Sequence, residues 1–146
     1  MSVDLRQRVL AFVAGFDNND LDAVMRCFAP DAEYIPPDGS RHRGLSAIRK
    51  AFAPQFAGVY GAMRFPLEDM LVDAGARKVA IRWTCHHEFS SGRRWRPAGL
   101  QQVLLRKVLG RKFHWQGVDI FHFDEQGLIA GKYSYANTLL PRLHKG

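Results

Sequence analysis

The sequence contains few cysteines and no long apolar run, and these absences exclude several classes of protein. Its two cysteines, Cys27 and Cys85, show no CxxC or metal-finger spacing, so we expect neither a disulfide framework nor a zinc finger. No apolar run is long enough to cross a bilayer. Asp4, Arg6 and Arg8 interrupt the N-terminal apolar stretch, so we expect neither a signal peptide nor a membrane span there. A reducing cytoplasm is the expected compartment.

The histidines lack the spacing of metal ligands. They are scattered along the chain as His42, His86, His87, His114, His122 and His144. Only His86 and His87 are adjacent, and neighbouring residues of a strand point to opposite faces. We therefore expect no metal site and no cofactor. The chain also lacks internal repeats and linkers, so a single domain spanning residues 1–146 is predicted.

Apolar residues at helical spacing predict three helices in the first half of the chain. Their apolar side chains recur three and four residues apart, which forms one stripe along each helix. The predicted helices span residues 3–17, 21–28 and 44–60, the last with a kink at Pro54. Residues 31–35 predict a short strand, followed by a proline-rich loop at 36–39.

From Met63 onward, apolar residues alternate with polar ones, which is typical of strands. The predicted strands lie at residues 63–67, 79–83, 113–115, 118–123 and 128–136, with turns at 73–75 and 124–127. Helices first and strands afterwards favour an α+β fold with an antiparallel sheet.

The segment between residues 90 and 110 has two interpretations. Residues 90–92 suggest a hairpin tip, which would make the segment one long twisted strand pair. Leu100, Val103, Leu104 and Val108 recur at helical spacing, which favours an inserted amphipathic helix at about 93–110. We favour the helix.

Positive charge is concentrated in residues 77–112, which carry ten basic residues and one acidic residue, Glu88. A solvated surface is the simpler interpretation. Because Trp95, Phe113 and Trp115 lie among the arginines and lysines, binding of nucleic acid is an alternative, although no known nucleic-acid motif accompanies them.

Three stretches, residues 12–52, 78–85 and 117–135, together resemble the nuclear transport factor 2-like superfamily. This superfamily includes ketosteroid isomerases, SnoaL-like polyketide cyclases and limonene epoxide hydrolases. The resemblance implies a cone-shaped, strongly bent antiparallel sheet packed on three N-terminal helices, as in cystatin-like folds. It also implies a pocket at the open end and a homodimer formed through the outer sheet face.

Matching the strands to this family gives candidate site residues. The resemblance places Arg82, Thr84 and His86 inside the pocket, and Val79, Ile81 and Trp83 on the outer face. On the later strand, it places Trp115, Gly117, Asp119, Phe121 and Phe123 inside. Phe12, Phe16, Tyr34, Pro36 and Ser134 complete the expected lining. Asp119, His86 and Arg82 are the candidate catalytic residues, with Asp119 as acid/base, His86 as proton carrier and Arg82 as partner of an enolate or carboxylate.

Two departures from the family's known patterns limit the reaction. Pro36 stands where the isomerase general base belongs, and Phe12 stands where its oxyanion tyrosine belongs, so that chemistry is not expected in its known form. The epoxide hydrolase pattern keeps its arginine as Arg82, but its carboxylates are replaced by Thr84 and Ser134.

These residues support three functional hypotheses. The first is acid/base catalysis by an isomerase, cyclase or dehydratase on a small apolar carbonyl compound. The second is a ligand-binding or dimeric accessory module without catalysis. The third is nucleic-acid binding through residues 77–112, which we rank last.

Overall fold

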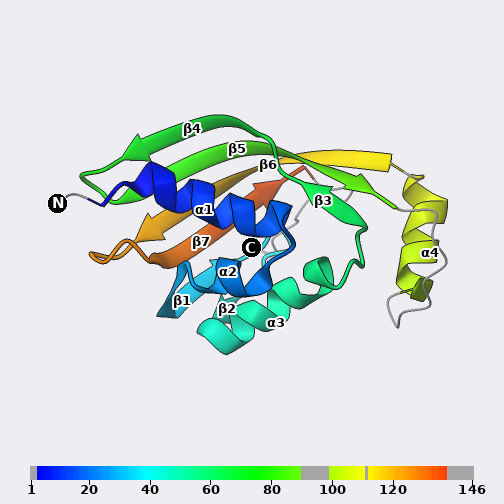
Figure 1. Ribbon diagram of the computed structural model, residues 1–146, viewed down its shortest axis with the longest axis horizontal. Coiled ribbons are helices and arrows are strands. Elements are labelled where there is room, and N and C mark those ends of the chain that lie inside the picture. The colour runs from blue at the N-terminus through cyan, green and yellow to red at the C-terminus, as the bar shows by residue number, and fades with distance from the viewer. Residues whose placement is uncertain (1–2, 90–98, 111, 138–146) are drawn as a thin grey trace, which may run out of the picture.

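The computed structural model describes residues 3–89, 99–110 and 112–137, and these form one curved sheet with helices packed on it (Figure 1). The helices are α1 (Leu5–Asp17), α2 (Leu21–Met25), α3 (Leu45–Phe56) and α4 (Gly99–Leu109). The strands are β1 (Phe28–Ile35), β2 (His42–Arg43), β3 (Ala62–Arg64), β4 (Leu67–Asp73), β5 (Lys78–Glu88), β6 (Lys112–Phe123) and β7 (Ile129–Ala136). The predicted α+β class is confirmed.

The first two helices each begin at an aspartate whose side chain caps the helix. Asp4 caps α1 by accepting from the Gln7 amide at 3.2 Å, and Asp20 caps α2 by accepting from the Ala23 amide at 2.9 Å. The second helix is shorter than predicted, because β1 already begins at Phe28. Pro30 is accommodated in β1 because the register of β1 against β7 shifts between Phe28 and Glu33.

The sheet runs in the order β2-β1-β7-β6-β5-β3, and β4 also pairs with β5. All these pairs are antiparallel except β1 with β7, which is parallel, so the expected antiparallel sheet is in fact mixed. The strands predicted at 113–115 and 118–123 form one continuous strand, β6.

The core lies between α1 and the concave face of the sheet (Figure 1). Phenylalanine rings fill it, and Phe12 contacts Phe16, Phe28 and Phe121 at centroid distances of 5.1, 5.9 and 5.2 Å. Burying such a side chain contributes about 1.5–3 kcal/mol. Because α1 and α3 cover only part of the concave face, the remainder is available as the wall of a cavity.

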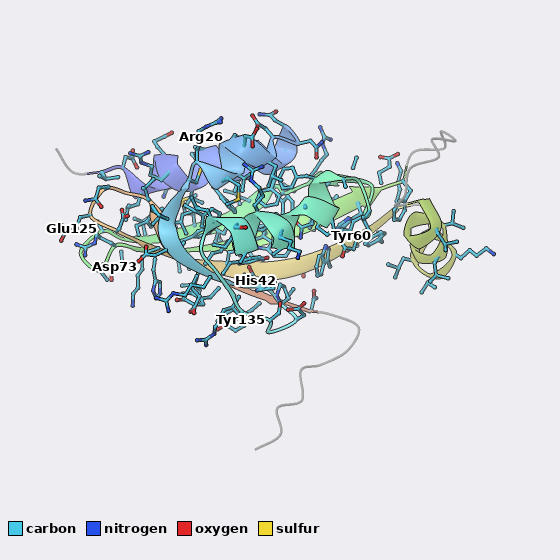
Figure 2. The ribbon with its side chains drawn as sticks, turned by 90° about the horizontal axis from the view of Figure 1, so that it is seen from below. Arg26, His42, Tyr60, Asp73, Glu125 and Tyr135 are labelled. Atoms are coloured by element: carbon cyan, nitrogen blue, oxygen red, sulfur yellow. The ribbon has the colours of Figure 1, made fainter. Side chains whose placement is uncertain are left out.

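Helix α4 stands apart from the rest of the domain, beyond the ends of β5 and β6, in both orientations (Figures 1 and 2). Its formation confirms the helical interpretation for residues 99–109, and residues 93–98 lie outside the described ones. Four of its apolar side chains are exposed, those of Leu100, Val103, Leu104 and Val108. Within the described ranges, no helix is long and apolar enough to cross a membrane.

Candidate binding pocket

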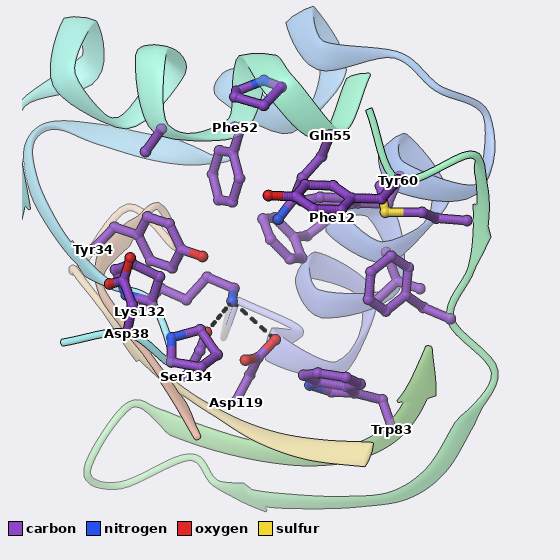
Figure 3. A pocket seen from close by; sticks show the side chains of 18 of the residues that line it. Phe12, Tyr34, Asp38, Phe52, Gln55, Tyr60, Trp83, Asp119, Lys132 and Ser134 are labelled. Carbon is purple, nitrogen blue, oxygen red and sulfur yellow. Dashed lines mark hydrogen bonds and ion pairs between the residues drawn. The ribbon is translucent and has the colours of Figure 1, made fainter. Parts of the chain in front are cut away.

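A cavity of about 740 Å³ opens between α1, α3 and the inner faces of β5, β6 and β7 (Figure 3). Its lining is mainly aromatic and aliphatic and includes Phe12, Phe16, Phe52, Phe65, Trp83 and Trp115. Cavities of 300–1,000 Å³ with apolar walls and a few polar groups are typical of small-molecule sites.

A buried ion pair forms the polar floor of this cavity. The Nζ atom of Lys132, on β7, lies 2.9 Å from Oδ2 of Asp119, on β6, and both side chains are less than a tenth exposed. The same Nζ donates to Oγ of Ser134 at 2.6 Å. It also lies 5.0 Å from the ring centroid of Tyr34 and 5.7 Å from those of Phe12 and Phe121. These rings offer their negative faces to the ammonium group.

The surroundings of the ion pair also shift two pKa values. Burial lowers the pKa of Lys132, while Asp119 opposes this change by favouring the charged ammonium. Burial raises the pKa of Tyr34, and the charge of Asp119 raises it further. Tyr34 is therefore a neutral hydroxyl group beside the pair.

Two buried polar atoms in the wall of the cavity have no hydrogen-bond partner among the described residues: Oδ1 of Asp119 and Nε1 of Trp83. In the close view, the indole nitrogen of Trp83 lies on the side facing Asp119 (Figure 3). Gly117 makes this position possible, because a Cβ there would lie 2.4 Å from the indole ring. Buried polar atoms are usually paired in folded proteins, so these two suggest a bound molecule.

A second polar group, His87 on β5, lies in the wall of the same cavity. Trp115 Nε1 donates to its Nε2 at 2.6 Å, so Nε2 is an acceptor, and Nδ1 donates to the Tyr60 carbonyl at 2.9 Å. Burial lowers the pKa of His87. The ring is thus neutral and fixed in one tautomer, and it holds Trp115 in place.

His87 is expected to make the fold sensitive to mild acid. The unfolded chain takes up a proton at this histidine near its ordinary pKa of 6.5, whereas the folded protein does so only at lower pH. The contribution of the neutral ring to the free energy of unfolding is fully present above pH 6.5. As the pH decreases below 6.5, this contribution decreases by up to about 1.4 kcal/mol per pH unit. Urea unfolding at pH 7 and 5.5 should show a larger loss for the wild type than for His87→Gln. Equal losses would contradict this assignment.

The structure places most of the predicted lining residues at the cavity. Those found in its wall are Phe12, Phe16, Tyr34, Pro36, Trp115, Asp119 and Ser134. Phe121 and Phe123 lie on the same side of β6 but are buried in the core. Gly117 also faces inward, where the indole of Trp83 fills the space that its missing side chain leaves.

The predicted positions of Arg82, Thr84 and His86 are wrong. Asp119 pairs with Ile81 in the β5–β6 register, and residues opposite one another share a face, so the residues next to Ile81 and Trp83 point outward. Arg82 is exposed and pairs with Glu68 at 2.5 Å and with Asp69 at 2.6 Å.

The β5 residues that the resemblance placed in the pocket therefore lie on the outer face. Those that it placed on the outer face lie inside. Thr84 donates to Glu68 on the outer side, and exposed His86 lies beside His114. Val79, Ile81 and Trp83, expected on the outer face, are buried in the core or the pocket wall.

The sequence argument missed many pocket residues, among them Trp83, His87 and Lys132. Trp83 and His87 lie two and six residues after Ile81 on β5, so all three share one face of the strand. Placing Ile81 on the inner face would therefore have identified both as pocket residues. Lys132 lies two residues before Ser134, and this spacing places both on one face of the strand.

Two basic residues of the 77–112 segment form ion pairs within the described residues. Arg82 is neutralised by two carboxylates, and Lys112 lies 3.5 Å from Glu88. Four further basic residues, Arg93, Arg94, Arg96 and Arg111, lie outside the described residues.

Comparisons with known proteins identify relatives of this fold. The model of a SnoaL-like domain matches residues 9–132, whereas the search of curated proteins finds no match. The epoxide hydrolase/cyclase-like enzyme SalBIII, which has a role in pyran ring formation in the polyether salinomycin, is 14% identical. Its TM-score is 0.69, covering 91% of this chain and 90% of its own.

Two further structures contain ligands. TerC, co-crystallised with polyporic acid, is 19% identical with a TM-score of 0.68, covering 91% of each chain. A Mycobacterium tuberculosis protein in complex with estradiol-17β-hemisuccinate is 18% identical with a TM-score of 0.63, covering 89% of this chain and 91% of its own. At these identities, the likeness demonstrates a shared fold.

Proposed function

Since this chain belongs to the SnoaL-like domain family, we propose that its pocket binds a small, largely apolar carbonyl compound on which Asp119 acts as acid and base. The volume and the aromatic lining of the cavity suit a molecule with one or a few fused rings. The ligands named for two structural neighbours, polyporic acid and estradiol-17β-hemisuccinate, are also ring compounds with oxygen substituents.

The observation that carries this proposal is the asymmetry of the Asp119 carboxylate. Lys132 and Oδ2 form the ion pair, while Oδ1 is buried and without a partner in the cavity wall. The carboxylate form of Asp119, which this ion pair contains, is the form that can accept a proton. Oδ1 is therefore the carboxylate oxygen that no described residue engages.

The proposed step is removal of a proton from the carbon next to the carbonyl group. Asp119 Oδ1 takes the proton, the C–H electron pair becomes a carbon–carbon double bond, and the carbonyl π electrons move to oxygen to give an enolate. Lys132 then balances the negative charge of the enolate, because Asp119 has become neutral. Return of the proton to another carbon isomerises the compound, and its transfer to a leaving hydroxyl group dehydrates it.

Exchange of the α-protons of 2-tetralone in D₂O, followed by proton NMR, tests this step without knowledge of the natural substrate. We expect the wild type to accelerate exchange and Asp119→Asn to lower the rate at least about a hundredfold, because the amide cannot accept the proton. Asp69→Asn, which changes an exposed carboxylate on the outer face, is the matched control.

Two outcomes would count against catalysis by Asp119. Exchange at the wild-type rate in Asp119→Asn would exclude this carboxylate as the base. Binding of 2-tetralone without accelerated exchange would favour a non-catalytic ligand-binding module, the alternative function for the same pocket.

A further inference from the structure

The reaction proposed above creates negative charge on an oxygen atom, and the pocket requires a donor for it. Phe12 has no donor group, and Arg82 lies on the outer face, paired with two carboxylates. Tyr34 and Ser134 both lie around Lys132. None of these arrangements leaves an obvious free donor beside Oδ1 of Asp119.

Trp83 has such a donor. Its side chain is buried in the pocket wall, and its Nε1–H has no acceptor among the residues the structure describes. Trp115, the other indole in this wall, differs because its N–H already donates to His87 at 2.6 Å. Of the two indoles in this wall, only Trp83 therefore has a donor without an acceptor among the described residues.

The sheet places this donor beside the proposed base. Trp83 pairs with Gly117, and Asp119 is two residues further along β6 on the same inner face. Residues related in this way are diagonal neighbours, within reach of an aromatic side chain. The absence of a side chain at Gly117 lets the indole lie over β6, with its nitrogen on the Asp119 side (Figure 3).

We propose that Trp83 Nε1 is the hydrogen-bond donor to the carbonyl oxygen, and then to the enolate oxygen, of the molecule on which Asp119 acts. This inference rests on the proposed function and makes Trp83 a catalytic residue. Asp119 and Trp83 are diagonal neighbours on the inner face, so Asp119 can take the proton of the α-carbon while the Trp83 Nε1–H stabilises the oxygen of the neighbouring carbonyl group. The indole keeps its proton throughout, so proton transfer involves only Asp119 and the substrate.

The same geometry defines the substrate class. The ligand presents a carbonyl oxygen, or the hydroxyl of its enol form, at the Trp83 and Asp119 end of the cavity and an apolar ring body to the phenylalanines. A hydroxyl group can donate to Oδ1 and accept from Nε1 at once. 2-Naphthol, which has the shape of the enol of 2-tetralone, is therefore the matching probe, and naphthalene is its counterpart without oxygen.

The experiment compares the affinities of these two probes, and the rate of 2-tetralone exchange, in the wild type and Trp83→Phe. We expect the wild type to bind 2-naphthol at least tenfold more tightly than naphthalene. Trp83→Phe should reduce this ratio about fivefold or more and lower the exchange rate about 100–1,000-fold, as for loss of one oxyanion donor. Trp115→Phe should change both affinities together and keep their ratio within about twofold.

Replacing Trp83 by benzothienylalanine removes the N–H but keeps the ring size, so it tests the same point if Trp83→Phe fails to fold. Wild-type exchange and an unchanged affinity ratio in the folded variant would overturn the role of Trp83. If Asp119→Asn still abolished exchange, the proposed function would remain and only this inference would fail. If the wild type bound neither probe and exchanged no protons, both would be overturned.

Discussion

Replacing Lys132 with methionine is expected to lower the free energy of unfolding by about 3–5 kcal/mol at pH 7. The change keeps an apolar chain of similar length but leaves the Asp119 carboxylate buried without its ion-pair partner. A buried charge without compensation is among the most costly defects in a folded protein. Urea unfolding followed by circular dichroism measures the difference.

The double variant Lys132→Met with Asp119→Leu provides the control for this prediction. It removes both charges, and apolar replacement of a buried ion pair is often neutral or stabilising. We therefore expect the double variant to recover most of the stability that the single change removes. A loss below about 1 kcal/mol in the single variant would mean that water reaches the pair, contrary to its burial in the structure.

Phe121→Ala is expected to cost about 3–5 kcal/mol of stability. The Phe121 side chain is fully buried, and its ring contacts Phe12 edge-to-face at 5.2 Å. The substitution removes these contacts and leaves a cavity below the ion pair that the surrounding strands cannot fill. Leu71→Ala, at a leucine that is 73% exposed on β4, should change stability by less than about 0.5 kcal/mol.

Chemical denaturation of both variants tests this prediction. Similar losses in the two variants would contradict the assignment of Phe121 to the core and of Leu71 to the surface. A large loss confined to Phe121→Ala would support the core described here.

The sequence was most informative where the structure depends on local spacing. The stripe from Leu5 to Phe16 predicted α1 because a helix brings residues three and four apart to one face. The same argument identified α4, although nothing in the described residues covers its apolar side. Family resemblance placed Asp119 on the inner face of β6, where the structure finds it.

Register between strands was not predictable in this way. Which face a strand residue occupies depends on its partner, and a shift of one position reverses every side chain. The inward placement of Arg82 with Asp119 failed for this reason, because Asp119 stands opposite Ile81.

Lys132 was missed for a different physical reason. Lysine is almost never fully buried unless it is paired, so a sequence pattern assigns it to the surface. Its partner belongs to the neighbouring strand, and only the β6–β7 pairing brings the two together. The polar floor of the pocket is thus a property of tertiary structure.

The parallel pairing of β1 with β7 has a consequence for how the chain reaches this structure. Glu33 and Tyr133 meet although they are 100 residues apart in sequence, so the contact order of the sheet is high and folding should be slow. During synthesis, β1 emerges long before β7, its partner in the sheet. Lys132 lies on β7, so the carboxylate of Asp119 acquires its counter-charge only after this strand has been made and has paired with β6.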